Sequence, residues 1–362
     1  MMKDDGTVWA TGTNTFGQLG INMIRYKMVT NFIKVLPGGA TAVAAGDGHS
    51  LVLKQDGSVW STGMNRNGQL GDGSSVDKDS FVQVIRSHAK SVSAGAEHSL
   101  VVTRDGGVWV TGSNLYGQLG DGTTVGRSIF SQVIFNGAET VVAGSRHSMV
   151  LKQDGSVWVT GDNEYGQLGD WTIHLKSNFV EVISGGAKAI AAGNSHSVVL
   201  KQDGSVWAVG DNEYGQLGDG SLDPQSSFIR VIFSGAKAIA AGYEHSMVLM
   251  NDGSVWGTGS NNYGQLGIGR IKFSGTFIPV ISSSAVLSSS VQGVGAGGWH
   301  STLLQYDGSL WATGANLNGQ LGDGTVIIKE QYVRVLLLPD SALCTAFAYP
   351  IFTAHVFLDV FI

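Results

Sequence analysis

Residues 191–218 read AAGNSHSVVLKQDGSVWAVGDNEYGQLG, and close variants of this stretch recur along nearly the whole chain. The closing tetrapeptide Gly-Gln-Leu-Gly occurs seven times, at successive intervals of 51, 49, 49, 49, 49 and 55 residues. Seven tryptophans, each shortly after an Asp-Gly pair, follow the same intervals. Regular recurrence at about 50 residues indicates a repeat architecture built from one small module per unit. The tetrapeptides begin at Gly17, Gly68, Gly117, Gly166, Gly215, Gly264 and Gly319.

Each unit alternates short β-branched or aromatic segments with turn residues. In one unit these segments surround Ile239, Met247, Trp256 and Phe277. Four such segments predict four strands per unit. The Asp-Gly pairs between segments, such as Asp203-Gly204, supply the positive φ angle of a tight hairpin turn. Neighbouring strands are therefore expected to run antiparallel.

The repeats predict an all-β fold, a seven-bladed β-propeller of four-stranded antiparallel blades. A sheet of about 50 residues cannot bury both faces alone, and radial stacking of such sheets covers them. We expect a single domain over residues 1–362, with the ring closed by the N- and C-terminal segments. The expected repeats lie near 1–38, 39–87, 88–136, 137–185, 186–234, 235–289 and 290–340, with degenerate closing strands in 341–362.

The closing strands are expected near the end of the chain because the chain begins just before a tryptophan strand. The segment from Ala354 to Leu358 is similar to the histidine strand of the other units. It could therefore supply the inner or middle strands missing from the first unit. Phe352 stands where the other units have the glycine of Gly-x-x-His-Ser, so the register of this blade stays open.

The shared pattern resembles the repeat of the regulator of chromosome condensation family. The resemblance rests on Ala-Ala-Gly-x-x-His-Ser, Asp-Gly-Ser-Val-Trp and Asn-x-x-Gly-Gln-Leu-Gly, and it covers six near-complete units and a split seventh. It implies a propeller whose relatives include the nucleotide exchange factor of the GTPase Ran, the plant ultraviolet-B photoreceptor and modules of large ubiquitin ligases. Fold alone does not choose among these functions.

Two of these relatives have sequence features that this chain lacks. The exchange factor carries a wedge inserted in one blade, whereas the middle units here keep a uniform 49-residue period. The photoreceptor carries Gly-Trp-Arg-His turns on successive blades, and here there is one Gly298-Trp299-His300. Exchange on a small GTPase is therefore the alternative function, and light sensing is disfavoured.

Composition narrows the class of partner. The net charge of −6, from 22 basic and 28 acidic residues, argues against nucleic acid, chromatin or an anionic membrane as partner, although a local basic patch stays open. The single cysteine, Cys344, fits a reducing compartment, as would a cysteine-poor secreted protein. No membrane-spanning run is present and the start is too polar for a signal peptide. An intracellular location, cytoplasmic or nuclear, is favoured.

Residues present once in every unit are interpreted as scaffold. The repeated tryptophans are expected to pack between blades. The repeated histidines lie one to a blade, which is too far apart for a zinc site, and no single Ser-His pair has a third orienting group. Asp162-Asn163-Glu164 and Asp211-Asn212-Glu213 lack the spacing of a calcium loop. We therefore predict no enzymatic activity, no catalytic residues, no metal site and no cofactor.

The units differ mainly in their turns. Antiparallel order places the Gly-x-x-His turns and the long Asn-x-x-Gly-Gln-Leu-Gly loops on one face, and divergent loops on a rigid scaffold commonly bind partners. We predict a protein-binding scaffold or regulatory propeller that acts through this face, the alternative being that these turns are merely solvated. The long loop that contains Trp171 and His174 also diverges. The predicted partner-binding residues are Trp299, Tyr243, Glu244, Arg146, Glu97 and Asp47.

Overall fold

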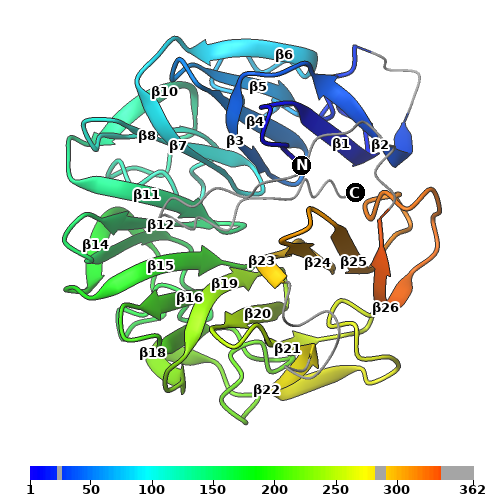
Figure 1. Ribbon diagram of the computed structural model, residues 1–362. Helices are drawn as coiled ribbons and strands as arrows, with labels where there is room; N and C mark the ends of the chain where they lie inside the picture. Colours follow the sequence, from blue (N-terminus) through cyan, green and yellow to red (C-terminus); the bar gives the residue numbers. More distant parts are fainter. Residues whose placement is uncertain (23–26, 282–290, 336–362) are drawn as a thin grey trace.

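The computed structural model describes residues 1–22, 27–281 and 291–335. The described chain is an all-β propeller in which sheets are arranged around a central axis (Figure 1). Six sheets have four antiparallel strands each, in sequence order. The first strand of each sheet lies innermost and contacts the first strand of the next sheet. No helix among these residues is long and apolar enough to cross a membrane.

The six four-stranded sheets are numbered here as blades 1 to 6. Blade 1 comprises β3 (Ala40–Ala45), β4 (His49–Lys54), β5 (Val59–Gly63) and β6 (Lys78–Ile85). Blade 2 comprises β7 (Ala89–Ala94), β8 (His98–Thr103), β9 (Val108–Gly112) and β10 (Arg127–Ile134). Blade 3 comprises β11 (Ala138–Ala143), β12 (His147–Lys152), β13 (Val157–Gly161) and β14 (Lys176–Ile183).

The other three blades repeat this order. Blade 4 comprises β15 (Ala187–Ala192), β16 (His196–Lys201), β17 (Val206–Gly210) and β18 (Gln225–Ile232). Blade 5 comprises β19 (Ala236–Ala241), β20 (His245–Met250), β21 (Val255–Ser260) and β22 (Phe273–Ile281). Blade 6 comprises β23 (Val291–Ala296), β24 (His300–Gln305), β25 (Leu310–Gly314) and β26 (Lys329–Arg334).

The N-terminal sheet differs from the predicted four-stranded blade. Within the part of the chain that the structure describes, it has two strands, β1 (Val8–Thr13) and β2 (Met28–Leu36). Trp9 packs against the core of blade 6, and Val8 packs against blade 1, so the sheet lies between them. Six of the seven predicted four-stranded blades are therefore present, whereas the first unit shows only two of its four predicted strands within the described residues. The predicted closing segment, 341–362, lies outside the described residues.

The apolar core lies between neighbouring blades, as the repeated tryptophans predict. Met149 and Leu168 of blade 3 pack with Ile190 of blade 4, and the ring of Trp207 lies against this cluster. Trp207 Nε1 donates to Ser205 Oγ at 3.1 Å, so the buried edge of the indole has a partner. The packing interpretation of the tryptophans is thus confirmed.

The repeated histidines join one blade to the next. His196 is fully buried, and its Nε2 lies 2.9 Å from Ser246 Oγ of the following blade. Ser246 Oγ donates its only proton to the Gln216 carbonyl at 2.8 Å, so the histidine Nε2–H must be the donor in this pair. The same bond recurs in the pairs His49–Ser99, His98–Ser148, His147–Ser197 and His245–Ser301.

The Gly-Gln-Leu-Gly loop is held by its own side chains. Asn163 Oδ1 accepts from the Leu168 N–H at 2.9 Å, and Gln167 Oε1 accepts from the Tyr165 N–H at 3.0 Å. Gly166 has φ +80° and lies so close to the next blade that an added Cβ would come within 2.6 Å of Ser226 Cα. The motif therefore recurs because it shapes the loop and permits the blades to approach.

Candidate functional site

Two sets of connections meet on one face of the propeller, which we call the turn face. These are the Gly-x-x-His turns and the long loops between the third and fourth strands of each blade. In blade 5 the Ser260 N–H donates to the Glu244 carbonyl at 2.8 Å, and in blade 6 the Ala315 N–H donates to the Trp299 carbonyl at 2.8 Å. These bonds place turns and loops side by side, as the antiparallel order predicts. The Asp-Gly turns lie on the opposite face.

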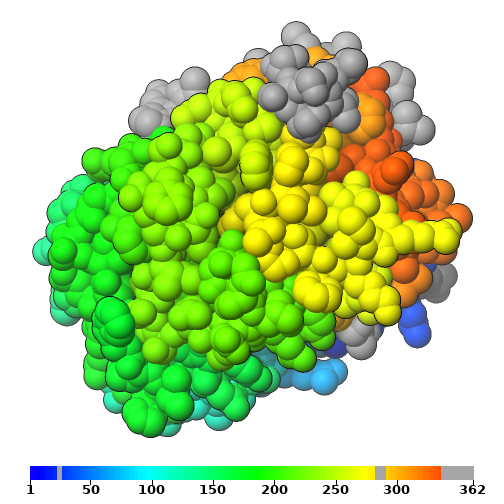
Figure 2. Space-filling model, turned by 90° about the horizontal axis from the view of Figure 1, so that it is seen from below, coloured from blue at the N-terminus to red at the C-terminus, as the bar shows by residue number. Residues whose placement is uncertain are grey.

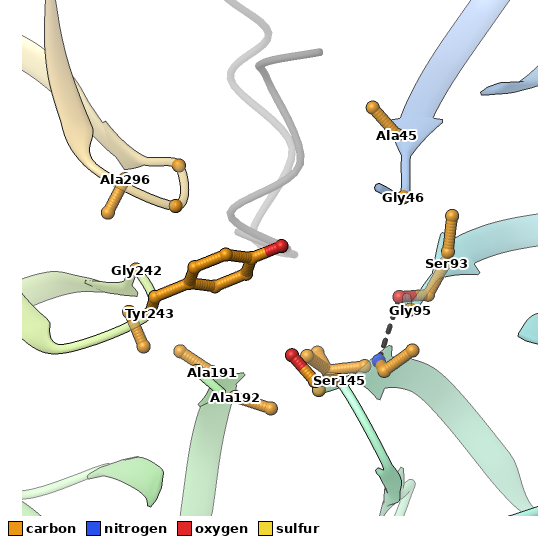
Figure 3. Close-up of a pocket in the computed structure, with 18 of the residues that line it drawn as sticks. Ala45, Gly46, Ser93, Gly95, Ser145, Ala191, Ala192, Gly242, Tyr243 and Ala296 are labelled. Carbon is orange, nitrogen blue, oxygen red and sulfur yellow. Dashed lines mark hydrogen bonds between the residues drawn. The ribbon is translucent and has the colours of Figure 1, made fainter. Parts of the chain in front are cut away.

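A pocket opens where the inner strands of the six blades end at the turn face (Figure 3). Its volume is about 120 Å³, and its walls are mostly alanine and glycine. The side chain of Tyr243 reaches into it, and Ser93 Oγ at its edge accepts from the Ala143 N–H at 2.9 Å. Small wall residues leave the tyrosine ring as the largest side chain in the pocket.

Tyr243 connects two blades across the axis. Its hydroxyl donates to Asp47 Oδ1 at 2.5 Å, although the two residues are 196 positions apart in the chain. Tyr243 belongs to the turn of blade 5 and Asp47 to the turn of blade 1. A hydrogen bond to an ionised carboxylate is stronger than one between neutral groups. The bond therefore fixes the direction of the tyrosine ring at the centre of the turn face.

Trp299 completes an aromatic cluster with two tyrosines. Its ring centroid lies 5.5 Å from that of Tyr243 at 87° and 5.4 Å from that of Tyr263 at 36°. All three residues are half-buried. An edge-to-face pair at this distance is favourable beyond simple burial. We call Trp299, Tyr243 and Tyr263 the aromatic cluster. Through the bond from Tyr243, the structure also brings the predicted residue Asp47 to this cluster.

Tyr263 was not predicted as a site residue. It belongs to the long loop of blade 5, at a position where tyrosine also occurs in the loops of blades 2, 3 and 4. A residue that recurs in several blades is interpreted as a packing residue, so the sequence did not distinguish Tyr263, which contacts Trp299, from the other three tyrosines. The signal that could have identified it is the lone tryptophan in the turn of the next blade.

Glu244 lies beside the cluster in an acidic surrounding. Burial raises its pKa first, and the nearby carboxylates of Asp211 and Glu213 raise it further, while a hydrogen bond with Ser260 acts in the opposite direction. The charge of Glu244 in turn raises the pKa of Tyr214. The boundary of blades 4 and 5 on the turn face therefore carries concentrated negative charge.

The two remaining predicted residues belong to other blades. Arg146 is exposed, and its guanidinium carbon lies 4.7 Å from the ring centroid of Tyr116, in the long loop of blade 2. Glu97 is half-buried in the turn of blade 2, where its carbonyl accepts from the Ser113 N–H at 2.8 Å. Both lie on the turn face, as predicted. The contacts of these side chains do not join them to Trp299 in the described residues.

The part of the chain that the structure describes contains no group of three or more His, Cys, Asp or Glu side chains arranged to hold a metal ion. The turn face instead presents aromatic rings, carboxylates and exposed guanidinium groups such as those of Arg66 and Arg146. Such groups are suited to binding another protein, since aromatic residues and arginine are enriched at protein–protein interfaces.

The repeat pattern and the blade architecture agree with a known family. A family model described as the RCC1-like domain matches residues 7–342. The chain belongs to this RCC1-like domain family. The match covers the N-terminal sheet and all six blades.

Solved structures of similar propellers support the fold of this RCC1-like domain. Human WBSCR16 is 23% identical, with a TM-score of 0.82 over 91% of this chain and 94% of that protein. Prp20p from Saccharomyces cerevisiae, studied with its binding to Gsp1p and histones, is 20% identical, with a TM-score of 0.79 over 93% and 88%. At such identities the likeness shows the fold alone.

Curated relatives match the RCC1-like domain over short segments. The RCC2 homolog of Xenopus laevis is 40% identical over 74 residues, which is 20% of this chain and 14% of that protein. The E3 ubiquitin-protein ligase MYCBP2 of Danio rerio is 35% identical over 71 residues, which is 20% of this chain and 2% of the ligase. The matched segments therefore span only a small part of these relatives.

Proposed function

We propose that this RCC1-like domain is a non-enzymatic, intracellular protein-binding scaffold that acts through its turn face. The observation that carries the proposal is the aromatic cluster, where Trp299 stands at a turn position that has no aromatic counterpart in the other five Gly-x-x-His turns. The surrounding strands are nearly identical from blade to blade, whereas these turns differ. Variation confined to one face of a rigid scaffold favours partner recognition there.

The geometry of the cluster supports this function. The bond between Tyr243 and Asp47 and the ring contacts of Trp299 hold the aromatic groups in place before a partner arrives. A preorganised surface loses less freedom on binding, so more of the contact energy appears as affinity. Binding of Prp20p to Gsp1p and histones, and of Kap60 to yeast RCC1, gives precedent for proteins as partners of such propellers.

Nucleotide exchange on a small GTPase is the second candidate. The similarity to Prp20p, which was studied with Gsp1p, favours it. The uniform 49-residue spacing from Gly68 to Gly264 argues against an inserted wedge in the middle blades. Nucleotide-release kinetics on a GTPase recovered with the protein would distinguish exchange from simple scaffolding, because a scaffold leaves the release rate unchanged.

Replacement of Trp299 tests the proposed site. Trp299→Ala is expected to weaken binding of a partner recovered by affinity purification by at least about 2 kcal/mol, because interface energy concentrates in a few aromatic residues. Gln202→Ala, in an exposed Asp-Gly turn on the opposite face, should leave the affinity unchanged. Calorimetric titration of the purified partner with both folded variants gives the measurement. Equal affinities would contradict a site at Trp299.

We also propose that the C-terminal segment completes the N-terminal sheet as a seventh blade. The support is the place of β1 and β2 between blade 6 and blade 1, and the absence from that sheet, within the described residues, of the two inner strands that every other blade has. Deletion from Ala346 onward is expected to lower the melting temperature and promote aggregation, because sheet edges become exposed. Thermal unfolding with light scattering measures both, and an unchanged, monodisperse protein would contradict closure.

A further inference from the structure

Trp171 occupies a backbone conformation that the other blades reserve for glycine. It follows the Gly-Gln-Leu-Gly-Asp sequence of blade 3 and has φ +67°. A left-handed backbone is unfavourable for a bulky residue, and at exposed sites such strain often marks a function. The equivalent residues of the other blades are Gly73, Gly122, Gly220, Gly269 and Gly324, with φ between +77° and +87°.

Trp171 also projects from the surface as part of an apolar ridge. It is 81% exposed, and Ile173 and Leu175 are 60% and 48% exposed. The three apolar groups are thus exposed within five residues of one loop. An exposed apolar group of this kind is typical of a contact surface. We call residues 171–175 the Trp171 ridge.

The ridge is held rigidly by its neighbours. The Trp171 N–H donates to the Ser226 carbonyl of β18 at 2.9 Å. Asn163 Nδ2 donates to the carbonyls of Thr172 and His174 at 3.0 and 3.2 Å. At its base, Lys176 Nζ lies 2.9 Å from Asp170 Oδ2, which neutralises both charges. The tryptophan is therefore held on a preorganised base whose two charges are paired with each other.

An apolar pocket of about 250 Å³ lies between blades 4 and 5. In blades 1, 3 and 4 a lysine covers the tryptophan of the third strand, as Lys201 does at 4.3 Å from the ring centroid of Trp207. In blade 5 the equivalent lysine is replaced by Met250, which leaves the wall beside Trp256 apolar. The lining residues are Gly218, Val231, Ile232, Met250, Trp256, Thr276 and Phe277.

We propose that Trp171 of one copy of this chain inserts into the blade 4–5 pocket of a second copy. A cavity of about 150 Å³ lined by apolar groups accepts benzene, so a pocket of about 250 Å³ has room for the larger indole. The two features are complementary, because Trp171 is an exposed apolar side chain and the pocket is an apolar hollow of sufficient size.

The positions of ridge and pocket suit a symmetric pair. Both flank β18, because Trp171 bonds to Ser226 near its beginning and the pocket is lined by Val231 and Ile232 at its end. Figure 2 shows a rim of the ring on which blades 4 and 5, coloured green to yellow, adjoin. A two-fold axis across β18 would place each ridge opposite the partner's pocket, so both contacts could form at once. This association does not depend on the proposed role of the turn face.

Two substitutions that copy other blades of the same chain test the proposal. Trp171→Gly restores the glycine of the other loops, and Met250→Lys restores the lysine that covers the tryptophan elsewhere, so both variants should fold. Sedimentation equilibrium over a wide range of protein concentration should show self-association of the unmodified chain. Each variant should weaken it at least about thirtyfold, the size of a hot-spot loss.

A mixture of the two variants provides the decisive measurement. Trp171→Gly keeps the pocket and Met250→Lys keeps the tryptophan, so the mixed sample should associate where neither variant does alone. Phe135→Ala is the control for general stickiness, because Phe135 is 77% exposed outside both ridge and pocket and its loss should leave association unchanged. A chain that stays monomeric at every concentration, a Met250→Lys variant that associates normally, or a mixture without rescue would each overturn the proposal.

Discussion

Lowering the pH from about 7 to about 5 is expected to destabilise this propeller strongly, because five fully buried histidines cannot take up protons while the blades stay together. Burial lowers the pKa of His49 and His147 from 6.5 to about 4. Burial lowers the pKa of His98, His196 and His245 to about 3, helped by neighbouring histidines. In the unfolded chain all five have the ordinary value.

The direction and size of the effect follow from these values. Above pH 6.5 the histidines are neutral in both states, and their contribution to stability is present in full. As the pH falls below 6.5 the unfolded chain binds protons that the folded chain does not, so stability is lost until the folded pKa is reached. At pH 5 the loss is about 2 kcal/mol for each histidine and about 10 kcal/mol for five. A typical domain has about 5–15 kcal/mol of stability in total.

Among the other titrating groups, the buried amine of Met1, whose pKa burial lowers from 8.0 to about 5, adds to the effect of the histidines in this range. Burial opposes ionisation of Asp170, but hydrogen bonds from Lys176 and Thr172 outweigh it and lower the pKa below its ordinary value of 3.8, so its stabilisation is lost only in stronger acid. The raised pKa of Glu244 acts in the opposite direction to the histidines, one group against five. Denaturant midpoints measured between pH 7 and pH 5 test the prediction, and a constant midpoint would contradict it. In His196→Gln the same pH change should cost about 2 kcal/mol less.

Gly193→Ala is expected to destabilise the fold by at least about 3 kcal/mol, the upper range for overpacking. Gly193 has an ordinary φ, so the backbone itself would accept alanine. The added Cβ, however, would lie 2.3 Å from the carbonyl oxygen of Gly242 in the next blade and 2.3 Å from His196 Cε1. Backbone belonging to a neighbouring sheet cannot move aside without parting the two blades.

Gly185→Ala provides the matched control. Gly185 also has an ordinary φ, and the nearest atom to an added Cβ would be the Asp154 carbonyl oxygen at 3.6 Å. This variant should change the free energy of unfolding by less than about 1 kcal/mol, with a gain expected from the stiffer unfolded chain. Denaturant unfolding of both proteins measures the difference. Comparable stabilities would show that the blades can separate locally at little cost.

The architecture could be predicted from sequence because its determinants repeat. Trp207 and His196 each contact the neighbouring blade in the same way as their counterparts do. Their recurrence in every unit therefore predicted a structural role. The first unit could not be settled in this way. The segment proposed to complete it has lost the motif glycine, since Phe352 stands at that position.

The site was only partly predictable because it depends on residues from distant repeats. Trp299 and Tyr243 were predicted from divergence between turns. The bond from Tyr243 to Asp47 was not, since it crosses the axis between blades 5 and 1 and depends on the curvature of the ring. Met250 is visible in sequence as a departure from lysine, but the pocket beside it required coordinates.

The histidine bond between blades has a consequence for how such a chain can change over evolutionary time. From His49–Ser99 to His196–Ser246 the two partners are always 50 residues apart, one residue more than the 49-residue repeat. Unequal recombination that exchanges one whole repeat for another therefore leaves every histidine opposite a serine. Turn sequences can be exchanged between blades without loss of the histidine–serine hydrogen bonds that connect the blades. The turn face can therefore diverge in sequence faster than the strands that carry it.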